Sequence, residues 1–293
     1  MRFKAFLCSL CLLVALLPGC AQENPCQVAA TTLPVYQFTA ALCQGTDIQV
    51  TQLITQQVSC LHDYSLNVSQ VRTIESAEVV VISGGGLEEF MEDTLQNANR
   101  VIDSSVDVPM LECEEHHDHE HDAESHHHDQ DAHIWLSPAN ARIMARNIAK
   151  GLTAAYPQYA DRFAFNLSML DQQFDALEEY GQRRLADLSC RELITFHDGF
   201  GYFAAAFDLH ILEAIEEESG SEASAKELKE MVALVREHQL PAVFTEISGS
   251  ASAAGIIAAE TGSKVYSLDM AMAGQDYFEA MYHNIDTIRE AMK

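Results

Sequence analysis

Basic residues are scarce in this chain. Its 293 residues include 17 Lys and Arg against 44 Asp and Glu, so the formal net charge is −27 with neutral histidines. Proteins that bind nucleic acid by neutralising phosphates need an electropositive face, and this composition excludes that class of partner. Hydrophobic residues make up 48% of the chain, which excludes global disorder because that apolar content can offset the entropy lost on folding. The length predicts one large domain or two ordinary ones.

Long apolar runs are also rare, and the one that stands out lies at the N-terminus. A basic start precedes an apolar or small stretch over residues 5–17, which ends at a Pro-Gly pair. A run of about 13 residues is short for a spanning helix and favours a secretory signal peptide over residues 1–19. No later segment reaches about 18 consecutive apolar residues, so we expect no other membrane span.

The sequence Leu17-Pro18-Gly19-Cys20 resembles the bacterial lipobox. The resemblance implies that Cys20 is acylated and anchors an extracytoplasmic lipoprotein to the cell membrane, since two or more acyl chains hold a protein stably at a bilayer surface. An ordinary cleaved signal followed by an unrelated cysteine is the alternative. Export would expose the remaining thiols to oxidation. These are Cys26, Cys43, Cys60, Cys113 and Cys190, an odd number whose connectivity the sequence does not define, and buried free thiols are the alternative.

Strand and helix signals alternate in two parts of the chain, residues 26–156 and residues 189–293. The run Val79–Ile82 is apolar at every position, as expected of a strand buried on both faces. The alternation predicts an α/β fold of two lobes, each with a parallel sheet flanked by helices. The predicted strands cover residues 28–32, 48–54, 79–82, 100–103, 193–196, 209–212, 242–245 and 264–268. The predicted helices between and after them cover residues 35–43, 68–77, 87–96, 200–207, 225–239, 250–260 and 277–292.

The segment between the two lobes, residues 157–188, has almost only helix signals. Its apolar stripe consists of Phe163, Leu167, Leu170, Phe174 and Leu177, at spacings of four, three, four and three. A helix of about 30 residues is about 45 Å long at 1.5 Å per residue. We therefore expect one long rigid helix to join the lobes.

Histidine is concentrated in one acidic segment, residues 112–131, which has nine acidic residues, seven histidines and no Lys or Arg. So little apolar content predicts a surface loop. Imidazoles bind borderline metals such as zinc, and carboxylates raise the local cation concentration. We expect this loop to bind several ions weakly through His116, His117, His119, His121, His126, His127 and His128. A merely solvated acidic loop is the alternative.

Four other side chains are candidates for a tight metal site, because they follow predicted strands or lie in loops of the same register. They are His62, His133, His197 and Asp269. In open α/β sheets, ligands bind in the crevice beyond the carboxyl ends of the strands. Each half of the chain supplies two candidates, so they are expected to converge in a cleft between the lobes. Any one of them alone is more often an ordinary polar residue, and only their joint placement points to a site.

The segments around these candidates resemble the metal-binding lipoproteins of bacterial ABC importers for zinc and manganese. The resemblance is carried by residues 31–36, 62–64, 85–88, 132–138, 196–202 and 264–269. It implies two α/β lobes joined by one long helix, a metal ion between them, and transfer of the ion to a membrane permease driven by a cytoplasmic ATPase. The acidic His-rich loop ahead of His133 is similar to the zinc-specific branch of that family.

The resemblance also implies the ligand set His62, His133, His197 and Asp269, with Glu246 as the alternative to Asp269. Three imidazoles and one carboxylate suit Zn²⁺, whereas Mn²⁺ favours more oxygen ligands. Manganese-selective relatives tend to carry a carboxylate at the position of His197. Two departures from the family pattern stand beside ligands, Ser65-Leu66-Asn67 near the first and Met270-Ala271 after the fourth. These departures leave open the setting of the first ligand loop and make Asp269 the least secure of the four ligands. Manganese is the alternative cargo.

The position of the first ligand also suggests a disulfide. Cys60 stands two residues before His62, and Cys113 lies at the start of the His-rich loop. We therefore predict a Cys60–Cys113 bridge near the metal entrance, with Cys26–Cys43 as a second possible pair.

Two common hydrolase motifs, one for zinc enzymes and one for serine enzymes, are absent from the sequence. It contains neither H-E-x-x-H nor G-x-S-x-G. Four protein ligands would close the coordination sphere, whereas catalytic zinc keeps a position open for water. We therefore expect a transport protein and no enzyme. We also expect it to be a monomer. A zinc hydrolase and a surface metal buffer are the alternatives, and the buffer predicts that deletion of residues 114–130 abolishes tight binding.

Overall fold

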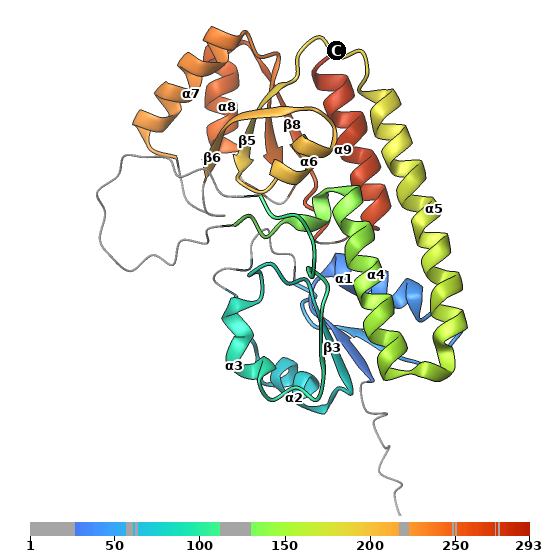
Figure 1. Ribbon diagram of the computed structural model, residues 1–293. Coiled ribbons are helices and arrows are strands. Elements are labelled where there is room, and N and C mark those ends of the chain that lie inside the picture. The colour runs from blue at the N-terminus through green and yellow to red at the C-terminus, as the bar shows by residue number, and fades with distance from the viewer. Residues whose placement is uncertain are drawn as a thin grey trace, which may run out of the picture.

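The computed structural model describes residues 27–56, 61, 64–111, 130–216, 223–247, 249, 251–272, 274 and 276–293 (Figure 1). The features predicted outside these residues are the signal peptide, Cys20, Cys26, Cys60, His62, Cys113 and the seven histidines of residues 112–129. The predictions for them stay predictions. Within the described residues, no helix is long and apolar enough to cross a membrane.

The first lobe is built on a four-stranded parallel sheet. Its strands are β1 (Val28–Ala30), β2 (Val50–Gln52), β3 (Val79–Ile82) and β4 (Val101–Asp103), in the order β2-β1-β3-β4. Val28 pairs with Val50 on one side and with Val79 on the other. Helix α1 (Leu33–Leu42) packs on one face of the sheet, and α2 (Val68–Ser76) lies on the other side (Figure 1). Burial from both faces explains why β1 is wholly apolar and buried.

The second lobe repeats this plan with a second parallel sheet. Its strands are β5 (Glu192–His197), β6 (His210–Glu216), β7 (Ala242–Glu246) and β8 (Lys264–Leu268), in the order β6-β5-β7-β8. Helices α7 (Ala225–His238) and α8 (Ser252–Thr261) cover one face, while α6 (Gly201–Ala206) and α9 (Tyr277–Ala291) lie on the other (Figure 1). The prediction of two parallel α/β lobes is confirmed.

One of two packed helices runs along both lobes. Helix α4 (Pro138–Ala155) packs against α5 (Ala160–Arg184), and α5 contacts α1 of the first lobe and α9 of the second (Figure 1). With 25 residues, α5 is about 37 Å long. It is shorter than the predicted helix because Pro157 opens a separate 3₁₀ turn, Pro157–Tyr159.

The apolar stripe of α5 faces the core, as predicted. Phe163, Leu170, Phe174 and Leu177 are all buried, and Leu167 is partly buried. The ring of Phe38 on α1 meets Phe174 on α5 and Tyr277 on α9 edge to face, with centroid distances of 5.6 and 4.9 Å. Buried aromatic contacts therefore join the first lobe, the long helix and the second lobe.

One predicted helix, over residues 87–96, is wrong in extent. The structure has a 3₁₀ turn at Glu89–Met91 and one helical turn at Glu92–Leu95 (α3). The physical reason is Glu88, whose carboxylate turns back to accept the backbone N–H groups of Ser83 and Gly84 at 2.7 and 2.9 Å. Gly84 has a φ of 82°, and a Cβ there would overlap Asp103. Residues 83–88 thus form a tight turn, and the first helical turn begins only after Glu88.

Candidate metal centre

The predicted ligands of the second lobe lie at the carboxyl ends of neighbouring strands. His197 ends β5, Glu246 ends β7, and Asp269 follows the last residue of β8. All three are buried, with exposed fractions of 4%, 7% and 7%. Because these strands are parallel and adjacent, their carboxyl ends form one edge of the sheet.

Strand alternation determines the face on which His197 and Glu246 lie. On β5, Ile194 and Phe196 belong to the apolar cluster under α7 and α8, whereas Leu193 belongs to the core shared with the first lobe. Successive side chains of a strand point to opposite faces, so His197 lies on the face of Leu193. On β7 the same alternation places Glu246 with Phe244, which also belongs to the shared core. Both side chains therefore face the first lobe.

His133 approaches from a loop of the first half of the chain. It stands directly before the 3₁₀ turn Ile134–Leu136. A single oxygen of Asp131 accepts both the backbone N–H and the Nδ1–H of His133, each at 2.8 Å. Burial alone would lower the pKa of His133, but the hydrogen bond and charge of Asp131 outweigh it and the pKa lies above its ordinary value. Asp131 therefore fixes the ring with Nε2 pointing away from it.

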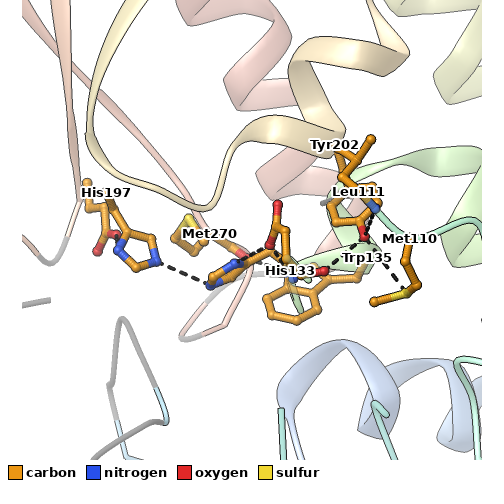
Figure 2. Close-up of polar contacts among 9 residues, drawn as sticks. Met110, Leu111, His133, Trp135, His197, Tyr202 and Met270 are labelled. Atoms are coloured by element: carbon orange, nitrogen blue, oxygen red, sulfur yellow. Dashed lines mark hydrogen bonds and ion pairs between the residues drawn. The ribbon is translucent and has the colours of Figure 1, made fainter. Parts of the chain in front are cut away.

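The two imidazoles converge at the lobe boundary. The Nε2 atoms of His133 and His197 lie 3.2 Å apart, and the rings are at 87° to each other (Figure 2). Two ligand nitrogens on a tetrahedral zinc ion, with Zn–N of 2.0–2.1 Å, are about 3.3 Å apart. The observed spacing therefore matches the edge of a tetrahedral zinc site.

A carboxylate stands behind each of these rings. Asp131 contacts Nδ1 of His133, and Oε1 of Glu246 lies 3.7 Å from Nδ1 of His197, beyond hydrogen-bond length. Metal-binding histidines commonly direct the ring nitrogen that does not bind the metal at a carboxylate, which fixes the tautomer and the ring orientation. The structure thus places Glu246 where it can orient His197.

Asp269 is held by the second lobe itself. Its backbone N–H donates to Oδ1 of Asn284, and its carbonyl accepts from Nδ2 of the same residue, both at 2.7 Å. The carboxylate accepts the N–H of Ala271 at 2.8 Å. Burial raises the pKa of Asp269, against the opposing effects of that hydrogen bond and of His283. Ala271 adopts a φ of 55°, so the chain turns sharply after Asp269.

The described part of the site is incomplete. No three His, Cys, Asp or Glu side chains among the described residues form a metal-binding cluster. The structure brings His133 and His197 together and places Glu246 behind the second ring. His62, the first predicted ligand, lies outside the described residues. The four-ligand set therefore stays a prediction.

Two positioning residues are missed by the sequence interpretation. It treats Asp131 only as one of the charges of the acidic loop. The Asp-x-His spacing of Asp131 and His133 could have indicated that this carboxylate orients the imidazole. Asn284 lies on the last helix and carries no motif. Among the cysteines, Cys43 is buried, and burial raises the pKa of its thiol to about 12. Cys26 lies outside the described residues, so the Cys26–Cys43 pair stays a prediction.

The comparisons with known proteins agree with this architecture. Residues 28–291 match the family described as ZnuA, the periplasmic component A of the zinc-uptake complex. A Treponema pallidum (strain Nichols) protein whose name refers to metal binding is 29% identical over 295 residues, which cover 95% of this chain and 93% of that protein. The zinc-binding protein AdcA of Streptococcus pyogenes serotype M6 is 27% identical over 91% of this chain, which spans only 56% of AdcA.

Solved structures show the same fold. The crystal structure of ZnuA is similar with a TM-score of 0.78 at 28% identity, and the match covers 91% of this chain and 99% of that chain. Two parallel sheets and a long helix between the lobes are thus common to both proteins. Since the family match extends over nearly the whole described chain, the protein belongs to the ZnuA family of periplasmic zinc-uptake components.

Proposed function

We propose that this protein is the extracytoplasmic solute-binding component of an ABC importer, which captures Zn²⁺ and delivers it to a membrane permease. The observation that carries the proposal is the 3.2 Å spacing of the Nε2 atoms of His133 and His197 at the lobe boundary. This spacing suits two ligands of one tetrahedral ion. The family, and the zinc named for AdcA, support zinc as the cargo.

We assign the four ligands as His62, His133, His197 and Asp269. Glu246 then orients His197 through Nδ1 and does not bind the metal. Three imidazoles and one carboxylate would fill the tetrahedral sphere of zinc and leave no position for a reactive water. The site therefore favours capture of the ion over catalysis.

We also propose roles for the lipid anchor and for the acidic His-rich loop. A lipid on Cys20 would keep a monomer at the outer side of the membrane, close to its permease. The acidic His-rich loop would collect cations before they reach the tight site, since its carboxylates raise their local concentration.

Titration of the metal-free protein with Zn²⁺ in a competition assay tests the ligand assignment. Loss of an imidazole ligand should exceed the effect of an orienting residue, which is about 10–100-fold, so His197→Ala is expected to weaken binding by more than about 100-fold. His210→Ala is the matched control, because His210 is an exposed histidine on the neighbouring strand β6. Equal affinities for the two variants would contradict the assignment. Parallel titration with Mn²⁺ compares the two candidate cargoes.

A further inference from the structure

The hydroxyl group of Tyr202 joins two chain segments that are far apart in the sequence. It accepts the backbone N–H of Leu111 at 2.9 Å and donates to the backbone carbonyl of Asp131 at 2.9 Å (Figure 2). Leu111 and Asp131 are themselves paired, because the N–H of Asp131 donates to the carbonyl of Leu111 at 3.0 Å. We call this pair the stem. The buried side chain of Tyr202 thus forms a hydrogen bond with each of the two residues of the stem.

Tyr202 and the stem belong to different parts of the molecule. Tyr202 lies on α6, five residues after His197, and is 3% exposed. The stem leads directly into the loop that carries His133, whose ring Asp131 holds. The Tyr202 hydroxyl therefore connects α6, which follows His197 closely in the sequence, to the segment that carries His133.

A second bond fixes the same segment from its other side. The indole N–H of Trp135 donates to the carbonyl of Met270 at 2.8 Å, and Met270 directly follows Asp269 (Figure 2). The hydroxyl of Tyr277 in turn donates to the carbonyl of Trp135 at 2.8 Å. His133 is thus bracketed by Asp131 and Trp135, two residues before and two after it, and both are bonded to the second lobe.

We propose that Tyr202 is a positioning residue that sets the distance between the two imidazoles, and that the His133 segment moves with the second lobe although it precedes the long helix in sequence. The proposal rests on the proposed zinc-binding function. Its physical basis is that the two bonds fix both ends of a five-residue segment, so that neither end can shift without breaking a buried hydrogen bond. Any relative motion of the lobes then leaves the His133–His197 pair intact.

Tyr202→Phe tests this proposal, because it removes the hydroxyl and keeps the ring. We expect zinc affinity to fall about 10-fold, the low end of the range for residues that orient metal ligands. We also expect the visible absorption spectrum of the Co²⁺-loaded protein to change, since it reports the arrangement of ligands around the metal. Tyr180→Phe is the matched control, as its hydroxyl donates to Asp286 at 2.8 Å between α5 and α9. It should alter neither quantity.

Trp135→Phe, which removes the other bond, is assayed in parallel and should produce a spectral change of its own. Native Co²⁺ spectra and native zinc affinity in the folded variants would overturn the proposal. This outcome is distinguishable from failure of the proposed function, because His197→Ala would still weaken zinc binding by more than about 100-fold. If His197→Ala leaves zinc binding intact, the ligand assignment fails first, and with it the role of Tyr202.

Discussion

At the scale of single residues, the proposed metal centre depends on groups that are not among its assigned ligands. The sequence pattern was enough to predict that His133 and His197 lie together, because polar residues at the ends of strands and beside known motifs are visible along the chain. Tyr202 could not be predicted, since its hydroxyl bonds to residues 91 and 71 positions earlier. Asn284 holds Asp269 from 15 residues away on another element. Such roles follow from tertiary contacts that no local pattern encodes.

Glu88 is a second buried group whose role depends on its surroundings. It accepts the hydroxyl of Thr31 at 2.6 Å in addition to the N–H groups of Ser83 and Gly84, and so ties the ends of β1 and β3 together. Burial nevertheless outweighs these hydrogen bonds and raises the pKa of Glu88 to about 7, from an ordinary value of 4.5. The folded protein therefore holds this proton more tightly than the unfolded chain does.

Glu88→Gln is expected to change how stability depends on pH. In the wild type, the contribution of this proton is fully present below pH 4.5 and is lost as the pH rises through about 7. The shift corresponds to about 3 kcal/mol. The stability of the wild type relative to the variant should therefore fall by about that amount between pH 4.5 and pH 8. Urea unfolding of both proteins across this range measures the difference, and parallel stability curves would contradict it.

At the scale of elements, the alternation of helices and strands could be predicted from the sequence, because the buried strands are short runs rich in apolar residues. The strand order β2-β1-β3-β4 of the first sheet could not be predicted, since strand pairing depends on where each crossover connection returns to the sheet. The predicted helix over residues 87–96 failed for a local reason, because the side chain of Glu88 stabilises the preceding turn. The predicted length of α5 failed because a proline opens a separate turn.

Close packing between α5 and the end of α6 gives a test at this scale. Gly181 of α5 faces Phe207 at the end of α6, and a Cβ there would overlap the ring. Gly255 of α8 is exposed, and a Cβ at that position would meet no atom within 4 Å. Gly255→Ala should stabilise the protein by about 0.5–1 kcal/mol through helix propensity. Gly181→Ala should destabilise it by about 1–3 kcal/mol, because overpacking outweighs the same gain.

Chemical denaturation of the two glycine variants, each compared with the wild type, gives both values. Two stabilised variants would show that α6 can move away from α5 at little cost. That result would also weaken the proposal that Tyr202, which lies on α6, sets the distance between the two imidazoles.

At the scale of the whole molecule, the proposed importer component and the surface metal buffer differ in where tight binding resides. We expect replacement of residues 114–129 by a Gly-Ser linker to lower the number of weakly bound zinc ions and to leave one tight site. The reason is that Asp131, His133 and His197 stand outside the replaced segment and keep their contacts. Equilibrium dialysis with Zn²⁺ counts both classes of site, and loss of the tight site would favour the buffer.

The aromatic contacts among Phe38, Phe174 and Tyr277 have a consequence for how this sequence can evolve. These rings come from three helices, and each pair of rings is more than a hundred positions apart in the sequence, yet each borders the others in one buried cluster. A smaller side chain at one position leaves a void bordered by the other two, and substitutions in contact are not additive. The three positions are therefore expected to vary together among descendants of this protein, as a single inherited unit.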